Sequence, residues 1–328
     1  MSVPLLEVRD LRTWFFTRWG VVKAVDGVSF TVREGETLGI VGESGCGKSM
    51  TALSILRLVP RPAGRIVGGE VLLDGEDLLG KSEREMRRLR GSRVSMILQD
   101  PMSSLNPVFS IGHQVAEALR IHQGLKGSGL WATAREMLRR VRIPSPEMRL
   151  RAYPHQLSGG MRQRVVGAIA LSCRPRVLIA DEPTTSLDVT IQAQYLRLLK
   201  ELQQEMRLAL VFITHDFGIV AKMCDRVAVM YAGRIVETAG VREIFNNPRH
   251  PYTRALLASV PPLESRVERL ASIEGQPPPL HNLPPGCPFA PRCAHARDVC
   301  QREYPPAVGV GSDGHRAACW KVAEGWDG

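Results

Sequence analysis

The chain has 328 residues, 44% of them hydrophobic, which suits a globular protein with one large core and a smaller appendage. No apolar run reaches the roughly 18 residues of a membrane span, and the N-terminus lacks the basic-then-apolar order of a signal peptide, so we expect a cytoplasmic protein. The net charge of +10 is partly local to arginine clusters at residues 84–93 and 135–151. Interleaved glutamates favour solvated helix faces there over a surface for nucleic acid.

Apolar segments of strand length recur up to about residue 231, and most are separated by segments with helical periodicity. This alternation predicts an α/β fold with a largely parallel sheet. Residues from about 100 to 157 carry mostly helical patterns, so we expect a helical subdomain inserted between two core strands. The predicted strands are residues 6–8, 28–32, 37–41, 69–73, 94–98, 177–180, 210–214 and 227–231, and the predicted helices are one from Ser49 and residues 111–122, 132–141, 160–171 and 191–205.

The last third of the chain differs in composition from the rest. Eleven of the 23 prolines lie between Pro248 and Pro291, which indicates an extended tether more than a packed helix or sheet. Four of the seven cysteines then fall within a short stretch near the end. We therefore predict a core domain at residues 1–247, a tether at 248–286 and a small unit at 287–328.

A phosphate-binding loop is predicted at residues 42–49, which fit the pattern G-x-x-x-x-G-K-[ST] between an apolar strand and a helix. The small residues of such a loop let backbone N–H groups converge on phosphate oxygens, and the helix N-terminus adds positive potential. Lys48 would neutralise the β- and γ-phosphates, and Ser49 would place its hydroxyl on Mg²⁺. The small residues are Gly42, Ser44, Gly45 and Gly47.

Two carboxylates, Asp181 and Glu182, end the apolar strand that begins at Val177. Such a strand presents acid groups at the carboxyl edge of a parallel sheet. Successive side chains point to opposite faces, so the two acids should have different tasks. Asp181 suits the Mg²⁺ shell, and Glu182 suits the activation of a water molecule.

Residues 157–164 read Leu-Ser-Gly-Gly-Met-Arg-Gln-Arg and resemble the signature motif of the ABC ATPase family. The resemblance covers about residues 5–245 and implies a P-loop ABC ATPase core with ATP and Mg²⁺ as ligands. The other family marks occur in the expected order and are Gln99, the acid pair at 181–182, Ser186-Leu187-Asp188 and His215.

The resemblance also implies roles for single residues. Gln99 would contact Mg²⁺ or the attacking water, and His215 would hold the γ-phosphate and orient that water. Phe15 lies where the family has an aromatic that stacks on adenine, and Trp19 is a rival for that place. The implied catalytic set is Glu182, His215 and Gln99, and the implied Mg²⁺ ligands are Ser49, Gln99 and Asp181.

Ser158, Gly159 and Gly160 open a helix, so their N–H groups form an anion site. In the family this site closes over ATP that is bound to the opposite subunit. The resemblance therefore implies a head-to-tail pair with a second ATPase subunit, which is usually a different chain. Two membrane permease subunits and an extracytoplasmic solute-binding protein complete such an importer, and the ATPase lies peripherally on the cytoplasmic face of the cell membrane.

Three features outside the shared motifs resemble the peptide and nickel importer branch of the family. They are residues 100–107 (Asp-Pro-Met-Ser-Ser-Leu-Asn-Pro), residues 250–257 (His-Pro-Tyr-Thr-Arg-Ala-Leu-Leu) and the C-terminal cysteines. We therefore expect an ATPase for import of dipeptides or oligopeptides, with nickel or another small solute as the alternative. A soluble ABC ATPase of DNA repair or translation is a further alternative, but the chain lacks their long coiled-coil insertion and second cassette. No nucleic-acid partner is expected.

The C-terminal cysteines have spacings of five, six and eighteen residues, which differ from the close pairs of structural zinc sites. Clustered cysteines in a cytosolic protein indicate metal more than disulfides. The segment resembles the region that binds a [4Fe–4S] cluster in ATPase subunits of peptide importers, with a structural role expected. Zinc, disulfides and free thiols remain alternatives. The four residues are Cys287, Cys293, Cys300 and Cys319.

Overall fold

The computed structural model describes residues 3–100, 104–185, 187–260, 273–311 and 314–325. The chain divides into two compact units. Unit 1 contains the described residues among 1–6, 32–36 and 80–213, and unit 2 contains those among 7–31, 37–79 and 214–328. No helix among the described residues combines the length and apolarity that crossing a bilayer requires.

The sheet strands of unit 1 are parallel, in the order β8-β7-β6. They are β6 (Val94–Ile97), β7 (Val177–Asp181) and β8 (Ala209–Ile213). Every residue of β7 and β8 is buried, as expected for strands of a parallel sheet that is covered on both faces. The predicted apolar runs of strand length are thus confirmed for this part of the fold.

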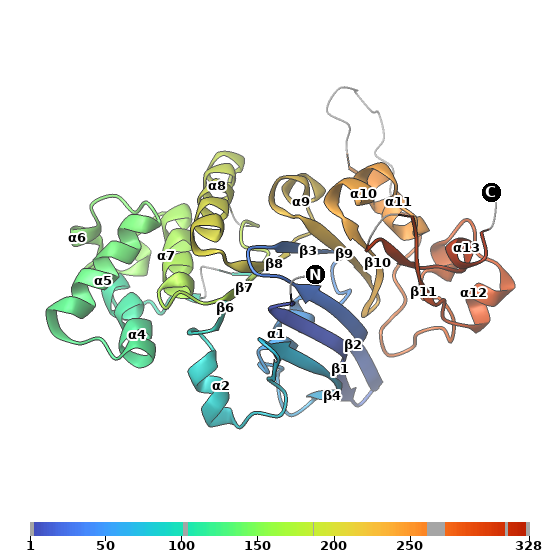
Figure 1. Ribbon diagram of the computed structural model, residues 1–328, viewed down its shortest axis with the longest axis horizontal. Coiled ribbons are helices and arrows are strands. Elements are labelled where there is room, and N and C mark those ends of the chain that lie inside the picture. Colours follow the sequence, from blue (N-terminus) through green and yellow to red (C-terminus); the bar gives the residue numbers. More distant parts are fainter. Residues whose placement is uncertain (1–2, 101–103, 186, 261–272, 312–313, 326–328) are drawn as a thin grey trace. The chain divides into compact units, whose positions relative to one another are not determined.

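The predicted helical subdomain is present in unit 1, where the described residues from 104 to 157 contain helices and no strand. Helices α4 (Ile111–Gln123) and α5 (Gly127–Arg140) pack against each other and against α7 (Gly159–Leu171) (Figure 1). They bury one apolar face each, with Val115 and Leu119 from α4 and Leu138 from α5. The remaining helices of this unit are α2 (Glu83–Leu89), α6 (Pro146–Arg149), η1 (Pro154–Gln156) and α8 (Val189–Met206).

The arginine clusters lie on solvated helix faces, as predicted. Arg139 contacts Glu136 at 2.7 Å, Arg135 approaches Glu147 at 3.9 Å, and Arg140 contacts Glu205 at 3.3 Å. All of these pairs have substantial exposure, so each contributes little to the free energy of unfolding.

Unit 2 contains a mixed sheet in the order β11-β12-β10-β9-β3. Strands β3 (Thr37–Val41) and β9 (Arg226–Tyr231) are parallel, whereas β9, β10 (Arg234–Gly240), β12 (Arg316–Ala318) and β11 (Ala307–Gly309) are joined in antiparallel pairs. The prediction of a largely parallel sheet therefore holds for the core strands and not for this edge. The helices around the sheet are α1 (Lys48–Ile55), α9 (Phe217–Met223) and α10 (Val241–Asn246).

A second sheet of four strands has the order β2-β1-β4-β5. Its strands are β1 (Leu6–Thr17), β2 (Gly20–Val32), β4 (Gly64–Leu73) and β5 (Glu76–Asp77). The sequence predicted only the most apolar ends of these strands. The remainder alternates irregularly between buried and exposed positions, so it carries a weak period-two pattern.

The prediction of an extended tether at residues 248–286 is wrong for its first part, where Pro251–Ala258 form helix α11. Pro251 occupies the first turn, a position where proline favours helix initiation, and the His250 side chain accepts the N–H of Tyr252 as a cap. Described residues 273–286 contain no helix or strand. Residues 261–272 lie outside the described part of the chain.

The cysteine-bearing segment belongs to the same compact unit as β9 and β10. Besides β11 and β12 it contains η2 (Ala290–Arg292), α12 (Asp298–Arg302) and α13 (Trp320–Ala323). The buried carboxylate of Glu237 in β10 accepts the N–H groups of Arg249 and His250 at 2.7 and 2.9 Å and lies 2.8 Å from Nε2 of His315. Strand pairing and this buried carboxylate therefore attach the segment to β10 and to the mixed sheet of unit 2.

Candidate active site

The phosphate loop of unit 2 runs from the end of β3 to the start of α1, as predicted. Gly42 and Gly47 have φ angles of 154° and 105°, which L side chains rarely adopt. A Cβ at Gly42 would lie 2.2 Å from the carbonyl oxygen of Met230, and one at Gly47 would lie 2.2 Å from that of Ala24. Only glycine fits at these two positions, because the loop passes directly over neighbouring backbone.

Lys48 is buried at the start of α1, and its ammonium group is held by the loop itself. Nζ donates to the carbonyl oxygens of Gly42 and Glu43 at 2.8 and 3.0 Å. Ser49 follows in the first turn of the helix, and Ser44 and Gly45 lie at the exposed tip of the loop. The two loop carbonyl groups thus fix the position of the ammonium group.

The two aromatic side chains that could stack on adenine differ in their exposure to solvent. Phe15 of β1 is half-buried and packs toward β4, where a Cβ at Gly64 would lie 2.8 Å from Phe15 Cε1. Trp19 is 72% exposed, with the Arg18 guanidinium 4.6 Å from its ring centroid. Trp19 is thus the more accessible ring, and the choice between the two stays a prediction.

In unit 1 the acid pair lies at the end of β7, as predicted. Asp181 is buried, and Glu182 is half-buried with a left-handed φ of 44°. Its backbone N–H donates to the carbonyl oxygen of Ile213 at 3.0 Å, which ties this strained residue to the end of β8. A glutamate in this conformation costs on the order of 1–3 kcal/mol, and such strain is concentrated at functional sites.

The structure brings Gln99 and Glu182 together. Gln99 Nε2 donates to Glu182 Oε2 at 3.3 Å, and Thr185 Oγ1 donates to the same oxygen at 3.1 Å. The sequence analysis did not single out Thr185, because its contact with Glu182 becomes visible only in the structure. His215 lies in unit 2, exposed between Thr214 and the α9 cap Asp216, whose N–H donates to Thr214 Oγ1 at 3.1 Å.

The signature residues lie at the N-terminus of the 13-residue helix α7. Ser158 is the N-cap, and its Oγ accepts the N–H of Met161 at 3.4 Å. A hollow of about 570 Å³ opens beside them. It is lined by Ser158, Gly159, Gly160, Met161, Arg164, Leu187, Asp188 and Ile191. The helix N-terminus and Arg164 favour the binding of an anion in this hollow of unit 1. Two predicted features lie partly outside the described residues. They are Ser186 of the Ser186-Leu187-Asp188 motif and residues 101–103 of the segment 100–107 that resembles the peptide and nickel importer branch.

The four C-terminal cysteines line one small cavity in unit 2, together with His250, His295 and Trp320. None of them forms a disulfide. Burial raises the pKa of Cys287 to about 12 and also raises the pKa of Cys293 and Cys319. Within the described part of the chain, no three His, Cys, Asp or Glu side chains lie close enough together to hold a single metal ion.

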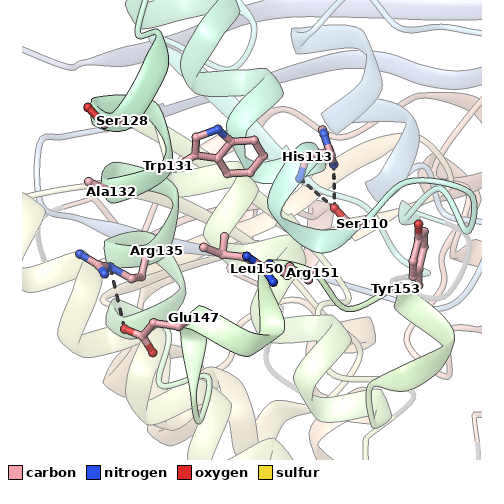
Figure 2. Close-up of a pocket in the computed structure, with 10 residues that line it drawn as sticks. All are labelled: Ser110, His113, Ser128, Trp131, Ala132, Arg135, Glu147, Leu150, Arg151 and Tyr153. Carbon is pink, nitrogen blue, oxygen red and sulfur yellow. Dashed lines mark hydrogen bonds and ion pairs between the residues drawn. The ribbon is translucent and has the colours of Figure 1, made fainter.

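A separate pocket of about 870 Å³ lies in the helical subdomain of unit 1 (Figure 2). The rings of Trp131 and His113 are perpendicular, with their centroids 5.3 Å apart, and Arg135 lies beside Glu147 on the opposite side. Trp131 and Tyr153 are about two-fifths exposed. The pocket therefore combines accessible aromatic surface with a charged rim.

Comparison with known proteins identifies the family. Residues 25–185 match the ABC transporter family, and residues 236–300 match the family described as oligopeptide/dipeptide transporter, C-terminal region. The chain is 56% identical to the probable peptide ABC transporter ATP-binding protein y4tR of Sinorhizobium fredii, over 98% of this chain and 96% of that protein. It is 50% identical to the dipeptide transport ATP-binding protein DppD of Bacillus subtilis, over 96% and 94%.

Solved structures give the same class. The ATP-binding cassette MJ0796, solved as a dimer bound to ADP and Pi, superposes with a TM-score of 0.65 at 26% identity and covers 72% of this chain and 99% of that one. The chain therefore belongs to the ATP-binding proteins of the ABC transporter family. Within that family it carries the oligopeptide/dipeptide transporter C-terminal region.

The start of α7 yields a first prediction, because a Cβ at Gly160 would lie 2.5 Å from Ile191 Cγ2, whereas one at Gly159 would meet nothing within 4 Å. Gly160→Ala should lower the free energy of unfolding by about 1–3 kcal/mol, since the Ile191 side chain or helix α7 must shift to admit the new methyl group. Gly159→Ala is the matched control and should change it by less than about 0.5 kcal/mol. Urea unfolding measures both, and equal effects would contradict the close packing at Gly160.

Proposed function

We propose that this chain is the ATP-hydrolysing subunit that powers import of dipeptides or oligopeptides across the cytoplasmic membrane. The observation that carries hydrolysis is the contact of Gln99 with Glu182, which joins the helical subdomain to the acid at the end of β7. The solute class is supported by the match to the peptide transporter C-terminal region and by the relatives named for dipeptide and oligopeptide transport.

The residues at the two parts of the site have distinct tasks in this proposal. The loop N–H groups and Lys48 bind the β- and γ-phosphates, and the residues that would hold Mg²⁺ are Ser49, Asp181 and Gln99; the ion would supply charge to stabilise the phosphates. Glu182 accepts a proton from the water that attacks the γ-phosphorus, and the bond to the β-γ bridging oxygen breaks to give ADP and phosphate. His215 orients that water and contacts the γ-phosphate.

A complete site requires two ATPase chains in this proposal. The exposed N-terminus of α7, with Ser158, Gly159 and Gly160, faces ATP on a second ATPase subunit, as the positive end of a helix favours a polyphosphate. The dimeric cassette MJ0796 supports this arrangement. The assembled importer also contains two permease subunits and an extracytoplasmic solute-binding protein, with this chain at the cytoplasmic face of the membrane.

The aromatic pocket of the helical subdomain is the proposed contact with a permease subunit. Trp131 and Tyr153 expose apolar area at a concave site, and aromatic residues in pockets contribute most of the binding energy of protein interfaces. Arg135 and Glu147 at the rim supply polar partners (Figure 2). A permease segment bound in this pocket would move together with the helical subdomain of unit 1, the unit that also contains Gln99.

The four C-terminal thiols are the proposed ligands of a [4Fe–4S] cluster. They converge on one cavity, and none is paired in a disulfide. Their sequence spacings of five, six and eighteen residues lack the close pairs of structural zinc sites, which favours the cluster over zinc. Cys287, Cys293, Cys300 and Cys319 would hold the cluster, which would supply a structural crosslink for a segment with a small core.

Glu182→Gln tests the hydrolytic function. It should leave ATP affinity close to that of the unaltered chain and lower turnover by about 10²- to 10⁴-fold, because the amide retains the shape and cannot accept the proton. ATPase activity of the assembled transporter and uptake of a labelled dipeptide or oligopeptide measure the effect. Glu117→Gln on the exposed face of α4 is the control. Wild-type turnover at the altered site would refute the role of Glu182.

Trp131→Glu tests the permease contact. A charge that the permease would have to bury in the pocket should reduce the amount of chain that cofractionates with permease-containing membranes by about tenfold or more, while ATP affinity stays unchanged. The matched control is Ile121→Glu, an exposed apolar residue of α4 that does not line the pocket. Equal membrane association of both variants would exclude this pocket as the contact.

Cys293→Ser tests the cluster. Chain purified without oxygen should be brown, absorb near roughly 400 nm and contain about four iron atoms. The serine variant should lose this absorbance and keep its ATP binding, whereas Cys173→Ser, outside the segment, should keep both. A colourless anaerobic preparation with one zinc per chain would overturn the cluster and leave the ATPase proposal intact.

A further inference from the structure

The cysteine-bearing segment contacts the phosphate loop directly through one arginine, within unit 2. Arg292 donates two parallel hydrogen bonds to the Glu43 carboxylate, Nη1 to Oε2 at 2.7 Å and Nη2 to Oε1 at 2.9 Å. Only 3% of the Arg292 side chain and 26% of the Glu43 side chain are exposed. A bidentate pair with this burial fixes both partners in position far more firmly than a surface ion pair.

Glu43 is the second residue of the phosphate loop and is held at three points. Its side chain binds Arg292, its N–H donates to the Tyr252 hydroxyl at 2.9 Å, and its carbonyl oxygen accepts from Lys48 Nζ at 3.0 Å. The conformation of this one residue therefore links α11 and the cysteine-bearing segment to the cation of the loop.

Arg292 is itself held in place by groups from three parts of the unit. Nη1 donates to the Tyr231 hydroxyl at 3.3 Å, and Nε and Nη2 donate to the carbonyl oxygens of Glu274 and Ile273 at 3.0 and 3.3 Å. The rings of Tyr231, Tyr252 and Phe289 pack together beside it, with centroids 4.5–5.4 Å apart. The guanidinium therefore has a fixed location, one residue before Cys293.

The charge of Glu43 explains why such an arginine is needed. A carboxylate in a loop that binds a polyphosphate repels the ligand and competes for the Lys48 ammonium. An arginine that neutralises it removes both effects, and the bidentate geometry keeps the carboxylate directed away from Lys48, whose bonds go to backbone carbonyls.

We propose that Arg292 is a positioning residue of the ATP site: it neutralises and orients Glu43, so that the C-terminal segment sets the affinity of the phosphate loop for nucleotide. This inference rests on the proposed ATPase function. It makes the cysteine-bearing segment a working part of the nucleotide site, with Arg292 acting through Glu43 and without contact to the ATP itself.

The test is a double-mutant cycle on the full-length chain, with the Kd for ATP and Mg²⁺ measured by calorimetry. Arg292→Gln should weaken ATP binding about tenfold, and Arg292→Lys should weaken it less, because lysine retains the charge and loses the bidentate geometry. Glu43→Gln should bind ATP within about threefold of the unaltered chain. In the double variant the loss caused by Arg292→Gln should largely disappear, because no carboxylate is left to neutralise.

The control is Arg302→Gln, an exposed arginine of α12 in the same segment, which should bind ATP like the unaltered chain. If the double variant is as weak as Arg292→Gln, Arg292 supports only the fold of the segment and the inference is overturned. It is likewise overturned if Arg292→Gln and Arg302→Gln bind equally well. Should Arg292→Gln fail to fold, Arg292→Lys with and without Glu43→Gln gives the same comparison. Failure of the unaltered chain to bind ATP would instead refute the proposed function itself.

Discussion

The close approach of the phosphate loop to neighbouring backbone is the constraint on which the rest of unit 2 depends. A Cβ at Gly42 or Gly47 would lie 2.2 Å from the carbonyl oxygen of Met230 or of Ala24, so glycine at these two positions is a condition for the fold as much as for phosphate binding. Met230 belongs to β9, which pairs in parallel with β3. The sheet register and the shape of the loop are thus set together.

The same end of β9 anchors the C-terminal segment. Tyr231 follows Met230, contacts Tyr252 and Phe289, and accepts from Arg292. Glu237 of the adjacent β10 holds the backbone of residues 249 and 250 and the His315 ring. Removal of one partner from such a buried polar group costs several kcal/mol, so the segment and the sheet stabilise each other.

Sequence reasoning predicted the elements that carry strong local patterns. Strands β7 and β8 are continuous apolar runs, and α4, α7 and α8 have clear apolar faces or motif starts, so their positions agree within a few residues. The phosphate loop and the acid pair were predicted because short local patterns define them: the loop follows G-x-x-x-x-G-K-[ST], and the two acids end an apolar strand. The β11–β12 hairpin was missed because its three-residue strands have no readable period.

Other parts of the site could not be read from local patterns. Arg292 and Glu43 are 249 positions apart, and the Tyr252 contact to the loop spans 209 positions, so only the fold brings these residues together. Helix α11 was misjudged because prolines were counted without regard to position: Pro251 in the first turn starts a helix that a central proline would break.

At Glu182 the left-handed backbone lowers the stability of the folded chain, whereas the proposed hydrolysis requires a glutamate at this position. Glycine, asparagine and aspartate adopt φ near 44° more readily than glutamate; the first two lack a carboxylate, and the carboxylate of aspartate stands on a side chain that is one carbon shorter. Selection for a more stable chain would favour those residues here, whereas selection for the proposed role of Glu182 as a base would retain glutamate. A search for thermostable variants that scored folding alone would therefore tend to remove the proposed base at this site.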